Sequence, residues 1–222
     1  MKVFFISFAL LAVLLAVYPF VFDHSEPGEK VEGFPWQIDI GVNGASTVFG
    51  VTLGKSSLAD AAGALGDDAQ LAIVESKGET GTLEMYFGHY RAGLISGKMI
   101  LQADVAPETL DTWKQTAVKV DYMKSGLARK YTLDSDNLPL ILQSVVQNIT
   151  FIPTVNLDEA IVLGRFGEPQ EKIMVNDTLT HYLYPSLGLD VALSSEQKDV
   201  LQYVSPDQFS RLRRPLLKQS TP

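Results

Sequence analysis

One glycine-rich segment has the residue types of a phosphate-binding loop: Gly50-Val-Thr-Leu-Gly54-Lys55-Ser56. Such a loop wraps successive backbone amides around phosphate groups, and it needs four residues between its two glycines. Only three residues separate Gly50 from Gly54, so the backbone is too short to make the wrap. We therefore expect no nucleotide site.

The imidazole groups that could transfer protons or bind a metal ion belong to His24, His89 and His181. A metal site needs ligands at fixed spacing, such as His-x-x-x-His, and the sequence has no such pattern. The chain also has no cysteine, which excludes thiolate ligands and a cysteine nucleophile. We expect no metal, no cofactor and no catalytic residue. A Ser-His-Asp set drawn from distant segments stays open as an alternative, because sequence spacing does not reveal it.

Tyrosines are the candidate binding residues. Tyr86 and Tyr90 fall in one expected strand region, and Tyr182 and Tyr184 fall in another. Because successive strand residues point to opposite faces, the even spacing puts each pair on a single face. Tyrosine is enriched at protein interfaces, so an exposed face of this kind predicts a contact surface. The alternative is that the rings pack against helices, with their hydroxyls at the rim.

The charge of the chain bears on its partners. The formal net charge is −8, whereas nucleic-acid binding depends on Lys and Arg that neutralise phosphates. We therefore expect no nucleic-acid partner.

Two segments of the chain share a sequence pattern and predict the same folding unit. Each has a short helix, at residues 55–68 and 156–169, with a polar N-cap, an acidic first turn and a terminal glycine. Ser57 and Asn156 are the expected first residues of capping boxes. The glycine at each end is expected to stop its helix in the left-handed conformation.

Further matches follow in the same order along the chain. Leu83–Phe87 matches Leu179–Leu183, and Leu101–Glu108 matches Leu201–Asp207. Apolar residues alternate with other residues across Leu189–Leu193, which predicts antiparallel strands with one buried face and one face toward water. Each copy is therefore expected to contain a helix, about three strands and a second helix.

The start of the chain predicts a membrane segment. Val3–Phe22 is apolar and uncharged, and at ~1.5 Å per residue a helix of this length crosses the ~30 Å hydrocarbon core. Lys2 precedes the segment and Asp23 and Glu26 follow it, which predicts a cytoplasmic N-terminus. No Ala-x-Ala site follows, so we expect an uncleaved anchor rather than a signal peptide.

The second copy carries motifs that occur together in one known group. A helix ends in Phe166-Gly-Glu-Pro169, an aromatic strand follows at His181-Tyr-Leu-Tyr184, and Gly188-Leu-Asp-Val191 comes next. In these features Asn156–Val204 resembles the small lipoprotein module of the outer-membrane β-barrel assembly machinery and the related fold of β-lactamase inhibitor proteins. The first copy matches more loosely, because Asp68 replaces the proline.

The resemblance implies tandem modules of an envelope protein that bind other proteins through the face of a sheet. The lipoproteins carry a lipidated cysteine, and this chain has an apolar N-terminal run instead. That difference predicts a single-pass inner-membrane protein with a cytoplasmic N-terminus and a periplasmic C-terminal domain.

The sequence thus predicts an α+β protein, with an N-terminal transmembrane helix followed by two related modules of helices and antiparallel sheet. The expected function is non-enzymatic protein binding or support of an assembly, with another envelope protein as the partner. The alternatives are a binder of lipid or cell-wall fragments and an enzyme with an unrecognised, dispersed site. The expected parts are an anchor (1–22), a tether and first strand (23–45), a first module (46–119), a connecting strand near 129–133 and helix near 138–147 (within 120–149), and a second module (150–218).

Overall fold

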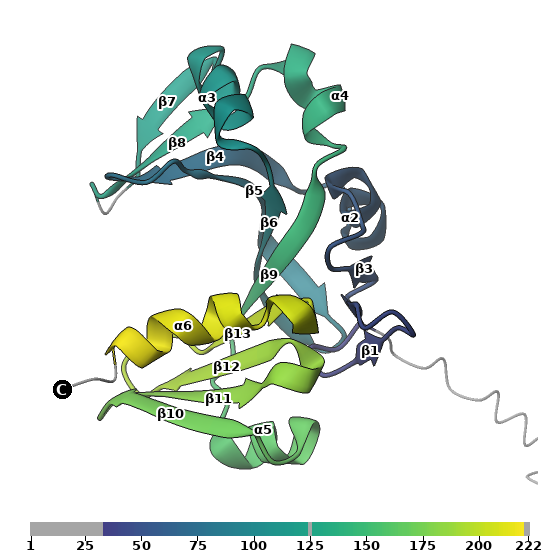
Figure 1. Cartoon of the computed structure of the whole chain (residues 1–222), viewed down its shortest axis with the longest axis vertical. Helices are drawn as coiled ribbons and strands as arrows, with labels where there is room; N and C mark the ends of the chain where they lie inside the picture. The colour runs from purple at the N-terminus through teal and green to yellow at the C-terminus, as the bar shows by residue number, and fades with distance from the viewer. Residues whose placement is uncertain (1–32, 124–125, 220–222) are drawn as a thin grey trace, which may run out of the picture. The chain divides into compact units, whose positions relative to one another are not determined.

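Antiparallel strands make up most of the regular structure in the computed structural model, which describes residues 33–123 and 126–219 (Figure 1). The strands of the first part of the chain are β1 (Ile38–Ile40), β2 (Ser46–Val48), β3 (Val51–Thr52), β4 (Gln70–Ser76), β5 (Thr82–Ala92) and β6 (Ile95–Asp104). Those of the later part are β7 (Lys119–Tyr122), β8 (Ala128–Thr132), β9 (Val145–Pro153), β10 (Glu171–Asn176), β11 (Leu179–Tyr184), β12 (Leu189–Ser194) and β13 (Val200–Val204).

Ten of these strands form one continuous sheet in the order β10-β11-β12-β13-β9-β6-β5-β4-β8-β7, and β1, β2 and β3 form a small separate sheet. Every neighbouring pair in the large sheet is antiparallel. The helices are α2 (Leu58–Leu65), α3 (Pro107–Gln115), α4 (Leu138–Ile141), α5 (Glu159–Phe166) and α6 (Ser210–Gln219), with short 3-10 turns η1 (Ser135–Asn137), η2 (Pro185–Leu187) and η3 (Pro206–Gln208).

The two matched helices form where the sequence predicts them. α2 begins with a complete capping box between Ser57 and Asp60. α5 has Asp158 rather than Asn156 as its N-cap, and the Asp158 carboxylate accepts the Ile161 amide at 2.7 Å. The glycines that end both helices have positive φ angles but extended ψ angles. They therefore turn the chain directly into the next strand and do not adopt the predicted left-handed conformation.

The expectation of an N-terminal transmembrane helix and a single-pass inner-membrane protein is corrected. Among the helices of residues 33–123 and 126–219, none is long and apolar enough to span a membrane. The longest of them, α6, has ten residues, whereas a span needs about 20. The predicted anchor at Val3–Phe22 lies outside the described residues.

The expectation of an α+β fold built from two separate helix-and-sheet modules is also wrong, because the structure is mainly β with one shared sheet. The main cause is β9, which occupies part of the segment where a helix was expected near residues 138–147. Its sequence Val-Val-Gln-Asn-Ile-Thr-Phe-Ile-Pro buries Val146, Ile149 and Phe151 and is rich in β-branched residues, which favour strands. β9 pairs with β6 on one side and β13 on the other, so it joins both halves into one sheet.

The main core lies on one face of the large sheet, which we call the covered face. Strand residues on this face alternate with residues on the opposite face, as the pleat requires. The helices α2, α3 and α5 add Leu58, Trp113 and Val162 to the same cluster. The sheet contributes fully or nearly fully buried residues from most of its strands: Ile73, Leu83, Met85, Phe87, Met99, Leu101, Ile149, Phe151, Tyr182, Tyr184, Leu189, Val191, Leu201 and Tyr203.

A second, smaller core lies on the opposite face, beneath α6. Leu183 of β11 follows Tyr182 in sequence and therefore points away from the covered face. It packs with Ile173, Val204, Phe209 and Leu216, of which the last two come from the η3–α6 segment. α6 thus covers β10 to β13 on this face (Figure 1).

Gly188 shows how tightly the second half is built. It has φ +69°, and a Cβ at this position would lie 1.9 Å from the backbone oxygen of Val204. The Val204 amide donates a 2.8 Å hydrogen bond to the Gly188 oxygen. The turn before β12 and the end of β13 are therefore in backbone contact, which leaves no room for a side chain.

Candidate functional site

Among residues 33–123 and 126–219, no helix lies over one face of the middle of the large sheet. In β5, β6 and β9, residues buried in the main core alternate with more exposed residues, except where a β-bulge interrupts the alternation. These partly exposed residues point to the side that α6 covers farther along the sheet. We call this surface the open face and define it by Glu84, Tyr86, Ile100, Gln102, Asn148 and Thr150.

Strand pairing arranges the open face in two rows across the sheet. Tyr86 lies beside Ile100, and Ile100 lies beside Thr150. The second row runs from Glu84 through Gln102 to Asn148 in the same way. The first row offers an aromatic ring, an aliphatic side chain and a hydroxyl group, and the second row offers a carboxylate and two amides.

Hydrogen bonds within the second row limit its motion. The Gln102 Nε2 amide donates to Glu84 Oε1 at 3.1 Å. The Thr150 hydroxyl donates to Asn148 Oδ1 at 3.2 Å, which links the two rows. A surface whose polar groups are already oriented loses less conformational entropy when a partner binds.

An open pocket of about 340 Å³ lies at one end of the open face. Gln102 and Asn148 line it from the sheet, and Leu212 lines it from α6. Asp104 and Arg211 add one carboxylate and one guanidinium group to its lining. The open face, with its apolar and polar side chains, is therefore bordered at this end by charged groups that water can reach.

Two of the tyrosines predicted as a contact surface are buried on the covered face. Tyr182 and Tyr184 are 4% and 2% exposed. The Tyr184 hydroxyl donates a 2.9 Å hydrogen bond to the Gly167 oxygen at the end of α5, and its ring centroid lies 5.7 Å from that of Phe166. Burial raises the pKa of Tyr184 to about 12. These rings pack against α5, which was the alternative that the sequence left open.

Tyr86 and Tyr90 do not share a face, although their spacing predicts that they should. Phe87 pairs with Met99 and Tyr90 pairs with Gly97, so β5 has one more residue than β6 between these two points. This β-bulge shifts the alternation by one residue. Tyr90 consequently packs on the covered face, with its ring centroid 6.2 Å from that of Phe87, and its burial raises its pKa. Of the predicted tyrosines, Tyr86 is the one on the open face.

A buried polar pair lies beneath the second half of the sheet. His181 Nδ1 is 2.9 Å from Asp190 Oδ2 and 3.0 Å from Oδ1. Because a carboxylate only accepts hydrogen bonds, Nδ1 must carry the hydrogen. Asp190 is 2% exposed, although the alternating pattern of β12 predicts that it faces water. The pair is not predictable from the sequence, because nothing in β12 itself indicates that α6 covers this face.

The pair has the geometry of a histidine oriented by an acid, but it lacks the third member of a hydrolytic triad. Within the described residues, the hydrogen bonds do not connect His181 to a serine, threonine or tyrosine hydroxyl. His89 is exposed and lies in the bulge of β5, on another part of the sheet. His24 lies outside the described residues.

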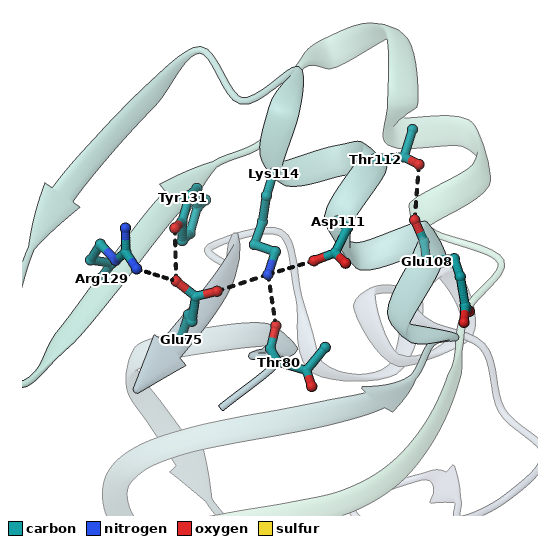
Figure 2. A network of polar contacts seen from close by, with 8 residues as sticks. All are labelled: Glu75, Thr80, Glu108, Asp111, Thr112, Lys114, Arg129 and Tyr131. Carbon is teal, nitrogen blue, oxygen red and sulfur yellow. Dashed lines mark hydrogen bonds and ion pairs between the residues drawn. The ribbon is translucent and has the colours of Figure 1, made fainter. Parts of the chain in front are cut away.

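A polar network fastens α3 to the covered face (Figure 2). Glu75 of β4 lies 2.8 Å from the Lys114 ammonium group and 3.0 Å from the Arg129 guanidinium group. It also accepts a 2.8 Å hydrogen bond from the Tyr131 hydroxyl. The hydrogen bond from Lys114 is the main cause that lowers the pKa of Glu75, and the other two groups act in the same direction.

Lys114 is held from several sides within this network. Its ammonium group lies 2.8 Å from Asp111 Oδ1 and donates to the Thr80 oxygen at 2.9 Å. The Glu75 and Lys114 side chains are mostly buried. Each charged group of the network has a partner in place, so the network serves to position α3. Glu75 and Arg129 also line an open pocket of about 310 Å³.

Two further observations on the described residues concern metal ions and lipids. They contain no group of three or more His, Cys, Asp or Glu residues arranged to hold a metal ion. An apolar cavity between α5 and the sheet is lined by Trp36, Phe151, Val162 and Phe166, among others, but its volume is about 10 Å³. That space is of the order of one water molecule and far too small for a lipid chain.

Comparison with known proteins found no match, so the proposed function rests on the structural features described above. No family model matches the chain, and no curated protein or solved structure matches it.

Proposed function

We propose that this protein is a protein-binding module whose contact surface is the open face. The observation that carries the proposal is the difference between the two sides of β5, β6 and β9. Residues of these strands on the covered face are fully or nearly fully buried, while Tyr86, Ile100 and Thr150 on the other side stay partly exposed.

The chemistry of the surface suits a protein partner. Tyr86 and Ile100 form an apolar centre, and the amides of Gln102 and Asn148 provide donors and acceptors beside it. Interface centres are typically depleted in charge and enriched in aromatic residues, with charged groups toward the rim. Glu84 is the charged residue among the six that define the open face, and Lys98 of β6 and Arg211 of α6 stand at its edge.

The alternatives have weaker support. Lipid binding needs a deep apolar cavity, and the cavity beneath α5 measures about 10 Å³. Catalysis would centre on His181 and Asp190, yet no hydroxyl nucleophile among the described residues hydrogen bonds to this histidine. The open face requires neither feature.

The proposal is tested by crosslinking in cells, with a photoreactive amino acid at Tyr86 or Ile100. Glu108 is the matched control position, because it is exposed on α3 and away from the open face. We expect one recurrent protein to be captured from both open-face positions and not from Glu108.

Binding of the captured protein is then measured with purified chains. Tyr86→Ala and Ile100→Ala should each weaken binding about tenfold or more, as truncation of a central aromatic or apolar contact does. Tyr122→Ala, which removes an exposed tyrosine on β7, should leave binding unchanged. If both open-face variants are folded and bind as tightly as the wild type, the open face is not the contact surface.

A further inference from the structure

The large sheet ends in an edge strand with unusual exposure of apolar side chains. β7 is the last strand of the sheet and pairs only with β8. Val118, Val120 and Tyr122 are 64%, 47% and 76% exposed. Edge strands of monomeric proteins are usually kept from pairing by a covering segment, by proline or by charges. The charges of β7 are one base and one acid, Lys119 and Asp121, so they do not repel every partner strand. In the described part of the chain, no other strand lies along the outer side of β7.

The backbone of β7 is ready to accept another strand. The Met123 amide donates to the Ala128 oxygen at 2.9 Å, and Asp121 lies opposite Lys130. Hydrogen-bonded and non-bonded pairs alternate along antiparallel strands. Asp121 and Met123 therefore direct their backbone groups toward β8, whereas Val120 and Tyr122 direct theirs away from the sheet.

The side chains of β7 match those of a second, antiparallel copy of itself. When two β7 strands pair about Val120, Lys119 of each copy lies opposite Asp121 of the other. Val120 then faces Val120 at the centre of the pair. When the strands pair about Asp121 instead, two carboxylates face each other, which is destabilising. Charge therefore selects the register centred on Val120.

We propose that the protein forms a homodimer in which two β7 strands pair antiparallel about Val120 and join the two large sheets. In one copy, Lys119 and Asp121 already form a 2.9 Å ion pair on one side of the strand. In the dimer these side chains form a line of alternating charge across the junction. The exposed Val120 and Tyr122 of the two copies lie on the other side of the junction.

The dimer is concentration-dependent, because β7 has four residues and the contact lies at the small end of protein interfaces. It also does not occupy the open face, which lies on β5, β6 and β9. The proposal is therefore independent of the proposed function, and each one can fail without the other.

The test exchanges the charges of β7 in the full-length chain. Lys119→Glu puts acid opposite acid in its homodimer, and Asp121→Lys puts base opposite base. We expect each variant alone to dimerise about tenfold more weakly than the wild type, because attractive pairs become repulsive ones at two symmetric places. Lys98→Glu makes the same charge change on β6 and should leave dimerisation unchanged.

Mixing the two variants provides the decisive result. A Lys119→Glu chain and an Asp121→Lys chain place opposite charges at both contacts of a mixed dimer, so their association should return to the wild-type level. One chain carries a fluorescent-protein tag, and fluorescence-detected sedimentation velocity measures the mixed dimer directly. Restored association also shows that both variants are folded.

A second variant tests the backbone contact. Val120→Pro removes an N–H group that points away from β8, so the fold is kept while the bond to the second copy is lost. We expect this chain to be monomeric. The proposal is overturned if the wild type stays monomeric up to about 0.1 mM, if Val120→Pro dimerises normally, or if mixing the charge variants restores nothing.

Discussion

Tyr86 and Tyr182 occupy equivalent places in two similar stretches of sequence, yet they lie on opposite sides of the sheet. Tyr86 belongs to the open face and is partly exposed, whereas Tyr182 is 4% exposed in the main core. Because the side-chain period of a strand is two, a difference of one residue in alignment reverses every side chain. Similar sequence in the two halves therefore does not mean similar environment.

The helices that follow the matched strands show the same reversal. α3 adds Leu110 and Trp113 to the core on the covered face, whereas α6 joins Phe209 and Leu216 to the core on the opposite face. Within the described part of the chain, the second half is consequently covered on both sides, and the first half on one side only. The open face exists because α3 and α6 take different sides.

Substitution in the buried pair of His181 and Asp190, under the second half of the sheet, is expected to change the free energy of unfolding most. His181→Leu leaves the Asp190 carboxylate buried without a partner and should lower the free energy of unfolding by about 3–5 kcal/mol. Urea denaturation followed by circular dichroism measures the loss. The double variant His181→Leu/Asp190→Leu should recover most of it, because no buried charge remains. A double variant no more stable than the single variant would contradict this account.

The packing of α6 gives the next largest effect. Leu183 is 0% exposed in the core beneath α6, so Leu183→Ala should cost about 2–4 kcal/mol. Ile100→Ala, on the uncovered part of the same side, should cost less than about 1.5 kcal/mol, since part of its surface already faces water. Equal losses in urea denaturation would mean that the two regions are buried to the same extent.

The attachment of α3 predicts a dependence on pH. The folded-state pKa of Glu75 is lowered from the ordinary value of 4.5. Its stabilisation is therefore present above pH 4.5 and is lost as the pH falls through the folded-state pKa. Glu75→Gln should be less stable than the wild type by about 1–3 kcal/mol at pH 7, and the difference should shrink toward pH 3.

Glu108→Gln is the control for this experiment, because in α3 it is the Glu108 backbone oxygen that accepts the Thr112 hydrogen bond at 2.9 Å. Its stability relative to the wild type, measured by urea denaturation, should not change between the two pH values. If Glu75→Gln gives the same difference at pH 7 and pH 3, the network does not stabilise the fold through the Glu75 charge.

The smallest expected change in stability is at Tyr86. Tyr86→Ala should alter the free energy of unfolding by less than about 1 kcal/mol, because the ring is partly exposed and none of the described helices lies over it. The same variant should still lose binding of the partner. A large loss of stability would show that Tyr86 belongs to the core rather than to a contact surface.

Local signals in the sequence predict the short elements well. The capping box of Ser57 and Asp60 and the glycine after each matched helix locate α2 and α5 correctly. These signals depend on residues a few positions apart. The turn at Gly188 is likewise marked by its glycine, which a contact with Val204 requires.

Features that depend on distant parts of the chain were not predictable in the same way. The bulge between Phe87 and Tyr90 appears only when β5 is aligned with β6. The place of β9 between β6 and β13 depends on pairing with segments far before and after it. Burial of Asp190 depends on which side α6 takes. The same holds for the candidate site. The sequence indicates which tyrosines lie in strands, but it does not indicate on which face of the sheet each one lies.

The central position of β9 has a consequence for how the chain folds during synthesis. β6 has no partner on one side until residues 145–153 have left the ribosome, and β9 lacks its second partner until β13 follows. Two hydrogen bonds near the start of the described chain also form only after β13 has been synthesised. The Ser46 hydroxyl donates to the Val204 oxygen, and the Tyr203 hydroxyl donates to the Pro35 oxygen. Such long-range pairing slows folding, so we expect the first half to leave the ribosome with its sheet edge exposed and to rely on chaperones until β9 pairs with it.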